Sequence, residues 1–199
     1  MRKRFIMVLV VAFAVLSFWG CSAGETDLSA GEQEALLQLF PEVEPDQIVN
    51  ITTEFMTAEI QEKFPAVVNV SKINDDYGFI CKPIGYSGPI KIAVGINTNE
   101  QKLVGIRIID HSETEHHVRD IENAWFVNRF VDKKVPVYLE YHVLEAVEDN
   151  QIVSVTGATI STSGIINGTN AAMGVFSEKV LNQSAEPVSL TVEGHIVSD

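Results

Sequence analysis

The chain has 199 residues, of which 46% are hydrophobic, and its 13 glycines and 7 prolines are typical of a globular protein. Its 14 Lys and Arg face 27 Asp and Glu, giving a formal net charge of −13. Such a surface repels phosphate backbones, which makes nucleic acid a poor candidate partner. The charge suits either plain solubility or electrostatic steering toward a basic redox protein.

Residues 1–21 are predicted to be a signal peptide or membrane anchor. Three basic residues precede an uncharged stretch over residues 5–19, which has the length of a signal-peptide hydrophobic region. The positive flank should stay in the cytoplasm, which places the rest of the chain on the extracytoplasmic side of a bacterial cell membrane. Cys21 resembles a bacterial lipoprotein processing site. Three outcomes are open: lipidation of Cys21, retention of an uncleaved anchor, or cleavage after Ala23.

The second cysteine, Cys81, lies in an apolar stretch and is predicted to be an inert core thiol. A disulfide between Cys21 and Cys81 is the alternative in an oxidising compartment, and it would exclude lipidation.

The mature part divides into a small, polar and acidic tether over residues 22–31, one domain over residues 32–181 and a tail over residues 182–199. The domain opens with a predicted helix over residues 32–40 that places Leu36, Leu37 and Phe40 on one face and ends at Pro41. A second short helix is predicted near residues 57–63.

Strands follow. Residues 67–73, 77–82, 90–96 and 103–109 are predicted strands, with turns at residues 74–76 and 97–101. Because the connections between them are short, they form an antiparallel meander of about four strands.

The second half mixes helices and strands. A helix is predicted over residues 120–131, with Ile121, Trp125 and the stretch from Phe126 to Phe130 facing inward. Strands are predicted over residues 135–143 and 152–155. The first of these places Val137, Leu139, Tyr141 and Val143 on one face.

A last helix is predicted to begin at a cap formed by Ser161 or Thr162 and to run to about Leu181. The tail either adds an edge strand over residues 190–192 or is loose. The fold class is therefore α+β, with an antiparallel sheet and helices on one side.

The stretch Val155–Thr162 (VTGATIST) carries the most chemical information. It places four hydroxyls and two small residues where a strand turns into a helix, and it contains no basic side chain. The free N–H groups and positive dipole end of a helix N-terminus stabilise a phosphate. The alternative is an ordinary strand–turn–helix whose Ser and Thr side chains only cap the helix.

Residues 156–159 resemble the S/T-G-A-T motif of FMN-binding domains of the RnfG/NqrC type. The order of three other segments agrees with the same family. Residues 36–41 (LLQLFP) resemble its opening, residues 85–90 (GYSGPI) resemble its G-Y-x-G-P-I, and residues 111–114 (HSET) resemble its H-x-E-T. The resemblance covers roughly residues 32–176.

The resemblance implies covalent FMN, joined through its phosphate to Thr159 by a dedicated flavin transferase. The site residues that it implies are Thr159 as the anchor, Thr156, Gly157, Ala158, Ser161 and Thr162 around the phosphate, and Gly85, Tyr86, Glu113 and Thr114 near the ring.

Two positions depart from the family pattern. The family usually follows E-T with P-G-x-G, whereas this chain has Glu115-His116-His117-Val118. The family also tends to carry Asp six residues before the modified Thr, where this chain has Val153.

The histidines near residues 111–117 have three readings. Together with Glu113 and Glu115 they could bind a divalent metal ion; they could form a solvated polar loop, which we favour; or His116 or His117 could tune the flavin. Trp125 and Phe126 are expected in the core rather than against a cofactor. No hydrolase signature, CxxC, haem motif, P-loop or dinucleotide fingerprint is present.

The resulting functional expectation is an electron-transfer flavoprotein module with no catalytic residues of its own and no metal. It would work as a subunit of an Rnf-type ion-translocating complex or as a free-standing electron carrier, tethered to the membrane through its N-terminus. The alternatives are a flavin-free binding or adaptor lipoprotein of the same fold and, ranked last, a metal-dependent enzyme.

Overall fold

A computed structural model describes residues 28–113 and 120–192. Its centre is a five-stranded antiparallel sheet in the order β1-β2-β3-β4-β5. The strands are β1 (Ile48–Asn50), β2 (Val67–Ile73), β3 (Asp76–Cys81), β4 (Ile90–Asn97) and β5 (Lys102–His111). The predicted four-strand meander is confirmed. The three-residue strand β1 pairs with the end of β2 and extends the sheet by one strand, which the sequence analysis did not predict.

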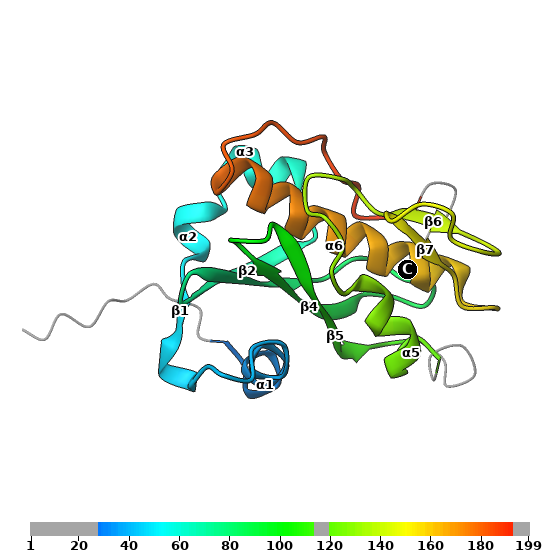
Figure 1. Ribbon diagram of the computed structural model, residues 1–199, viewed down its shortest axis with the longest axis horizontal. Coiled ribbons are helices and arrows are strands. Elements are labelled where there is room, and N and C mark those ends of the chain that lie inside the picture. The colour runs from blue at the N-terminus through cyan, green and yellow to red at the C-terminus, as the bar shows by residue number, and fades with distance from the viewer. Residues whose placement is uncertain (1–27, 114–119, 193–199) are drawn as a thin grey trace, which may run out of the picture.

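Helices cover both faces of this sheet (Figure 1). Helix α6 (Thr159–Lys179) and the short helices α2 (Thr52–Phe55) and α3 (Ala58–Lys63) lie over one face. Helix α1 (Ala30–Leu39) lies over the other. The expectation of helices on one side is therefore wrong. Each face of strand β4 meets a helix. Its residues from Ile92 to Ile96, including Ala93 and Gly95, are therefore all buried, whichever face they lie on.

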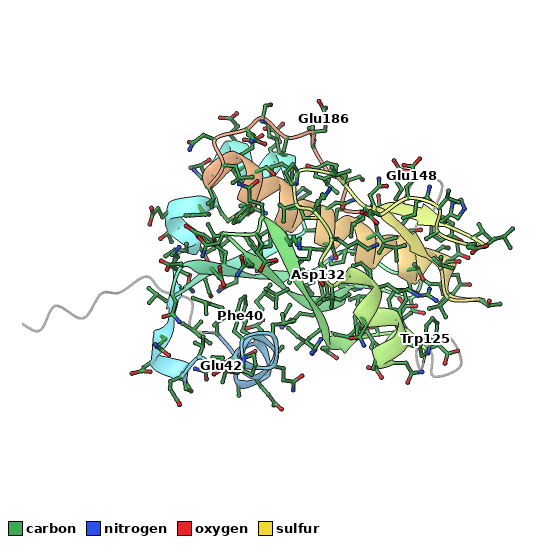
Figure 2. All side chains as sticks on the ribbon, viewed as in Figure 1. Phe40, Glu42, Trp125, Asp132, Glu148 and Glu186 are labelled. Atoms are coloured by element: carbon green, nitrogen blue, oxygen red, sulfur yellow. The ribbon has the colours of Figure 1, made fainter. Side chains whose placement is uncertain are left out.

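Helix α1 begins two residues earlier than predicted because Ser29 caps it. The Ser29 side chain accepts from the Glu32 N–H, and the Glu32 carboxylate accepts from the Ser29 N–H at 2.8 Å, which forms a capping box. Leu36 and Phe40 then form a second, smaller core against Ile80 and Ala93 of the sheet (Figure 2).

The predicted helix over residues 120–131 is shorter in the structure. The described part has one turn of α-helix, α5 (Ala124–Val127), followed by the 3₁₀ turn η2 (Asn128–Phe130). The Asn123 amide bonds the Asp120 carboxylate at 3.2 Å, a local interaction that favours a turn over a helix. Ile121, Phe126 and Phe130 are buried as expected. Trp125 is 47% exposed and projects from the surface, so its expected place in the core is wrong (Figure 2).

The predicted strand over residues 135–143 shrinks to β6 (Glu140–His142), which pairs in parallel with β7 (Gln151–Val153). The cause lies on α6. The Asn170 side chain accepts from the Leu139 N–H at 2.8 Å and donates to the Leu139 carbonyl at 2.9 Å, so neither backbone group is available for a strand ladder. Val137 and Val143 are exposed, against the expected single buried face.

The segment after α6 has no strand over the described residues up to 192, so the edge-strand alternative is wrong. Backbone hydrogen bonds join Val188 to Lys63 and Leu190 to Ile84.

Cys81 is fully buried in the main core, and burial raises the pKa of its thiol, as expected of an inert residue. Within the described ranges, no helix is long and apolar enough to cross a membrane. Residues 1–27, including Cys21, lie outside the described residues.

Candidate functional site

The turn that leads from β7 into α6 is shaped by its backbone. Gly157 has φ = 81°, a left-handed conformation that glycine adopts without strain. The Ala158 N–H donates to the Val155 carbonyl at 3.0 Å, and the first helical bond runs from Thr162 N–H to the Ala158 carbonyl at 2.8 Å. Ala158 is therefore the N-cap, and no side chain caps the helix. The predicted cap at Ser161 or Thr162 is wrong, because the N-cap, Ala158, lies three to four residues earlier.

An uncapped helix start leaves its first N–H groups without intrahelical acceptors. Residues 159–161 form this first turn, at the positive end of a 21-residue helix. The stretch 151–178 has no Lys or Arg of its own, so within this stretch the positive potential comes from backbone N–H groups. The arrangement favours an anion such as a phosphate ester.

The hydroxyls of the turn differ in accessibility. Ser161 and Thr162 are buried and engaged: Ser161 Oγ donates to Glu113 Oε2 at 2.9 Å, and Thr162 Oγ1 accepts from the Val155 N–H at 3.4 Å. Thr156 and Thr159 are exposed. Only these two hydroxyls of the turn are open to a ligand or to a modifying enzyme.

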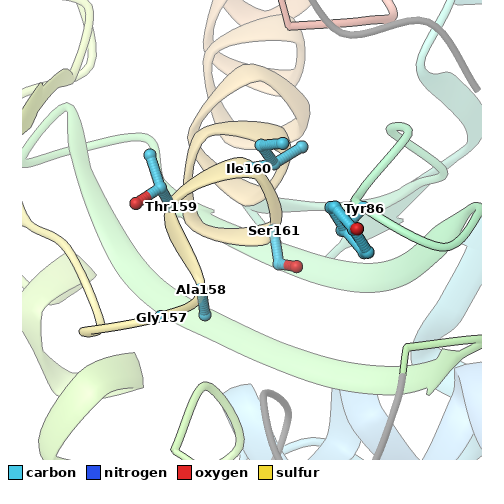
Figure 3. Close-up of a pocket in the computed structure, with 6 residues that line it drawn as sticks. All are labelled: Tyr86, Gly157, Ala158, Thr159, Ile160 and Ser161. Atoms are coloured by element: carbon cyan, nitrogen blue, oxygen red, sulfur yellow. The ribbon is translucent and has the colours of Figure 1, made fainter.

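A cavity of about 180 Å³ lies against the same turn. Its walls are Tyr86 on one side and Gly157 to Ser161 on the other (Figure 3). Thr159 lines it and Thr156 does not. Whole-ligand pockets usually have a volume of at least about 300 Å³. This cavity therefore has room for one end of a larger ligand, whose remainder would lie on the surface.

Three further residues that the resemblance implied, Tyr86, Gly85 and Glu113, lie at the rim of the cavity or behind it. Tyr86 is 57% exposed at the rim. Gly85 packs directly against Glu113: a Cβ at position 85 would lie 2.4 Å from Glu113 Oε1. Glu113 does not line the cavity but joins its two walls, because Oε1 also accepts from the Ser87 N–H at 3.0 Å. Thr114 lies outside the described residues.

Two residues near the turn were not singled out from the sequence. The Tyr141 hydroxyl on β6 lies 3.4 Å from Thr159 Oγ1. The Arg129 guanidinium donates to the Val153 carbonyl and lies 4.6 Å from the centre of the Trp125 ring. Burial lowers the pKa of Arg129. Both residues reach the turn across the fold, so no local sequence signal indicates them.

The three interpretations of the histidines depend partly on residues 115–118, which lie outside the described residues. Of the histidines in this region, the structure describes His111, whose Nε2 lies 3.0 Å from Glu122 Oε1. Over the residues that the structure describes, no group of three or more His, Cys, Asp or Glu side chains could hold a metal ion.

Comparison with known proteins identifies the same region. Residues 85–174 match the model of a family described as FMN-binding domain. No curated protein matches the chain. Among solved structures, the crystal structure of Shewanella oneidensis NqrC is similar with a TM-score of 0.46 and 16% sequence identity. The similarity covers 54% of this chain and 55% of that chain, about half of each.

Proposed function

We propose, from the match of residues 85–174 to the FMN-binding domain family, that this chain carries FMN covalently on Thr159 and transfers electrons. One observation supports Thr159 above its neighbours. Thr159 is the hydroxyl-bearing residue of the turn that is exposed and also belongs to the cavity wall, and its Oγ1 accepts from the Tyr141 hydroxyl at 3.4 Å, whereas Ser161 and Thr162 are buried.

The residues present fit the phosphate end of FMN. The uncapped first turn of α6 offers backbone N–H donors, and the small residues Gly157 and Ala158 allow a ligand to approach the backbone. Tyr86 provides an aromatic surface at the rim. The limited volume of the cavity agrees with a cofactor held at one end. When bound, FMN would supply the redox chemistry, and the chain would supply its position and its electrostatic surroundings.

The attachment requires an activated flavin, because an alcohol that attacks a free phosphate would have to expel hydroxide, which is a poor leaving group. We propose that a flavin transferase presents FAD to the folded chain. The Thr159 hydroxyl oxygen attacks the flavin-side phosphorus and a phosphoester bond forms. The phosphoanhydride bond breaks and its electron pair leaves with AMP. The hydroxyl proton passes to a base of the transferase.

We further propose that the domain works on the extracytoplasmic side of a bacterial cell membrane, held by lipidated Cys21 or by an uncleaved N-terminal segment. The basic start and apolar stretch of residues 1–19 support this location. A covalent bond would keep the cofactor from being lost there. The net charge of −13 favours a basic redox partner, either within an Rnf-type complex or as a separate carrier.

The test is intact-mass analysis of the chain after incubation with FAD and a flavin transferase. The wild-type chain should gain the mass of FMN minus water and fluoresce in a denaturing gel. The added mass should be found on the peptide that contains Thr159. Thr159→Ala should gain nothing, and Thr159→Ser should retain modification because it keeps the hydroxyl. Thr53→Ala, an exposed threonine on α2, should behave as wild type.

Covalent FMN on Thr159→Ala would contradict the assignment. A wild-type chain that stays unmodified under these conditions would favour the flavin-free binding or adaptor module instead.

A further inference from the structure

Glu113 is a buried carboxylate that bridges two separate segments. Its side chain extends from the chain just after β5 and is 8% exposed. Oε2 accepts from Ser161 Oγ at 2.9 Å, and Oε1 accepts from the Ser87 N–H at 3.0 Å. One bond reaches the first turn of α6 and the other reaches the loop that carries Tyr86. Ser161 belongs to one wall of the cavity, and Ser87 follows Tyr86 of the other wall.

The same two segments approach closely behind the bridge. Gly164, one turn further along α6, faces the loop backbone so tightly that a Cβ there would lie 2.6 Å from the Ile84 carbonyl oxygen. Gly85 leaves the space that Glu113 Oε1 occupies. The segments are thus held by close packing at Gly164 and by the carboxylate at Glu113, which is the contact nearer the cavity.

A carboxylate suits this bridge for a chemical reason. An ionised carboxylate only accepts hydrogen bonds, so both donors must turn toward it, and bonds to a charged group are stronger than neutral ones. Among the described residues no Lys or Arg forms a salt bridge with Glu113. The bond from Ser161 places Glu113 Oε2 beside the first turn of α6.

We propose that Glu113 is a positioning residue for flavin attachment: it holds the loop of Tyr86 and the first turn of α6 at the spacing at which Thr159 accepts FMN. This inference rests on the proposed function. It assigns Glu113 an action through Ser87 and Ser161 and requires no contact between Glu113 and the flavin. Thr159 is unchanged in every variant of the experiment below, so each variant can still be modified. The quantity measured is therefore the rate of FMN attachment.

The experiment compares Glu113→Ala, Glu113→Gln and a matched control in a time course with FAD and a flavin transferase. Glu113→Ala should slow attachment at Thr159 by about tenfold or more, because ångström-scale misplacement of a reacting group can cost on the order of 100-fold. Glu113→Gln should restore the rate to within about threefold of wild type. Its amide oxygen can accept from Ser87 and its NH₂ can donate to the Ser161 hydroxyl.

The matched control is Glu178→Ala at the opposite end of the same helix. Glu178 Oε1 likewise accepts from two donors, Lys63 Nζ at 2.7 Å and the Ala185 N–H at 3.3 Å. Its loss should lower the melting temperature without slowing attachment. If Glu113→Ala does not fold, Ser161→Ala removes only the α6 half of the bridge, and Ser163→Ala serves as its control.

The outcomes separate the two proposals. A wild-type chain that takes no FMN contradicts the proposed function. Wild-type modification at Thr159 together with an unchanged rate in folded Glu113→Ala contradicts the positioning role alone. A Glu113→Gln chain as slow as Glu113→Ala also contradicts it, because the charge and not the bridging geometry would then be the requirement.

Discussion

At the scale of single residues, the glycines of α6 set how closely the helix approaches its neighbours. A Cβ at Gly168 would lie 2.7 Å from the Pro83 ring, and one at Gly174 would lie 2.2 Å from the Phe64 ring. At Gly164 the neighbour is backbone, the Ile84 carbonyl, which cannot rotate away as a side chain can. The helix therefore rests directly on the loop that forms one wall of the cavity.

Gly164→Ala should destabilise the protein by about 1–3 kcal/mol, because the added methyl forces the helix and the loop apart. Gly31→Ala in α1 is the matched control. Its Cβ would lie 3.7 Å from Ile109, an ordinary contact, so the substitution should stabilise by roughly 0.5–1 kcal/mol through helix propensity. Chemical denaturation of the two variants measures both effects. Equal and small changes would show that the Gly164 contact relaxes freely.

The residues of the candidate site that are adjacent in the chain could be singled out from the sequence. Gly157 and Thr159 could be predicted because the S/T-G-A-T motif is local. Tyr141 and Arg129 could not, because each reaches the turn from a distant segment. Glu113 was predicted from resemblance, but its bonds to Ser87 and Ser161 depend on tertiary packing that no spacing indicates.

At the scale of elements, prediction succeeded where local patterns determine structure and failed where a distant side chain does. The meander was predictable because its short turns leave few other pairings. The segment 135–143 has a strand-like pattern, yet Asn170 on α6 takes the backbone bonds of Leu139 and leaves only β6 as strand. The sequence also did not indicate that a helix covers the second face of the sheet. The contact between α1 and that face depends on tertiary packing and leaves no local pattern in the strands.

The segment after α6 is fastened to the domain by Tyr138. Its hydroxyl donates to the Glu186 carbonyl at 2.7 Å, and Val188 beyond it is buried. Burial, with the nearby Glu178 and Glu186 carboxylates, raises the pKa of Tyr138 to about 12. The folded state thus favours the neutral phenol.

Tyr138 should therefore make stability depend on pH in the alkaline range. The free phenol titrates near pH 10, so the contribution of Tyr138 is complete below about pH 10 and is lost as the pH rises through about 12. Tyr138→Phe should lower the free energy of unfolding at pH 7 by about 1 kcal/mol through the lost hydrogen bond. It should also flatten the alkaline decline. Melting curves of both proteins from pH 8 to 12 measure this, and parallel declines would contradict the assignment.

At the scale of the whole molecule, the site lies at one end of the domain, where the main core reaches the surface at Ala158. The start of α6, β6 and β7 lie together at this end (Figure 1). The rest of α6 runs back over the sheet, and most of its residues are buried. The cavity is thus built on the end of the most buried helix, which gives an exposed site a rigid support.

The charge of the molecule, −13, leads to a prediction for electron exchange under the proposed function. Transfer from the reduced flavin to a basic redox protein should slow as ionic strength rises from about 0.01 M to 0.15 M, since the Debye length falls from about 30 Å to about 8 Å. Transfer to an uncharged small acceptor should not change. Stopped-flow measurements with both acceptors make the comparison. Equal salt dependence would show that the charge serves solubility only.

The exposure of Thr159 also bears on the order of events in the life of the protein. Its hydroxyl is accessible in the folded domain, at the first residue of a helix whose remaining turns pack into the core. Under the proposed function, the cofactor plays no part in building the core, so the chain can fold first and be loaded afterwards. Synthesis and maturation are then separate steps, and a cell could keep a reserve of finished, colourless protein that becomes active only when flavin is supplied.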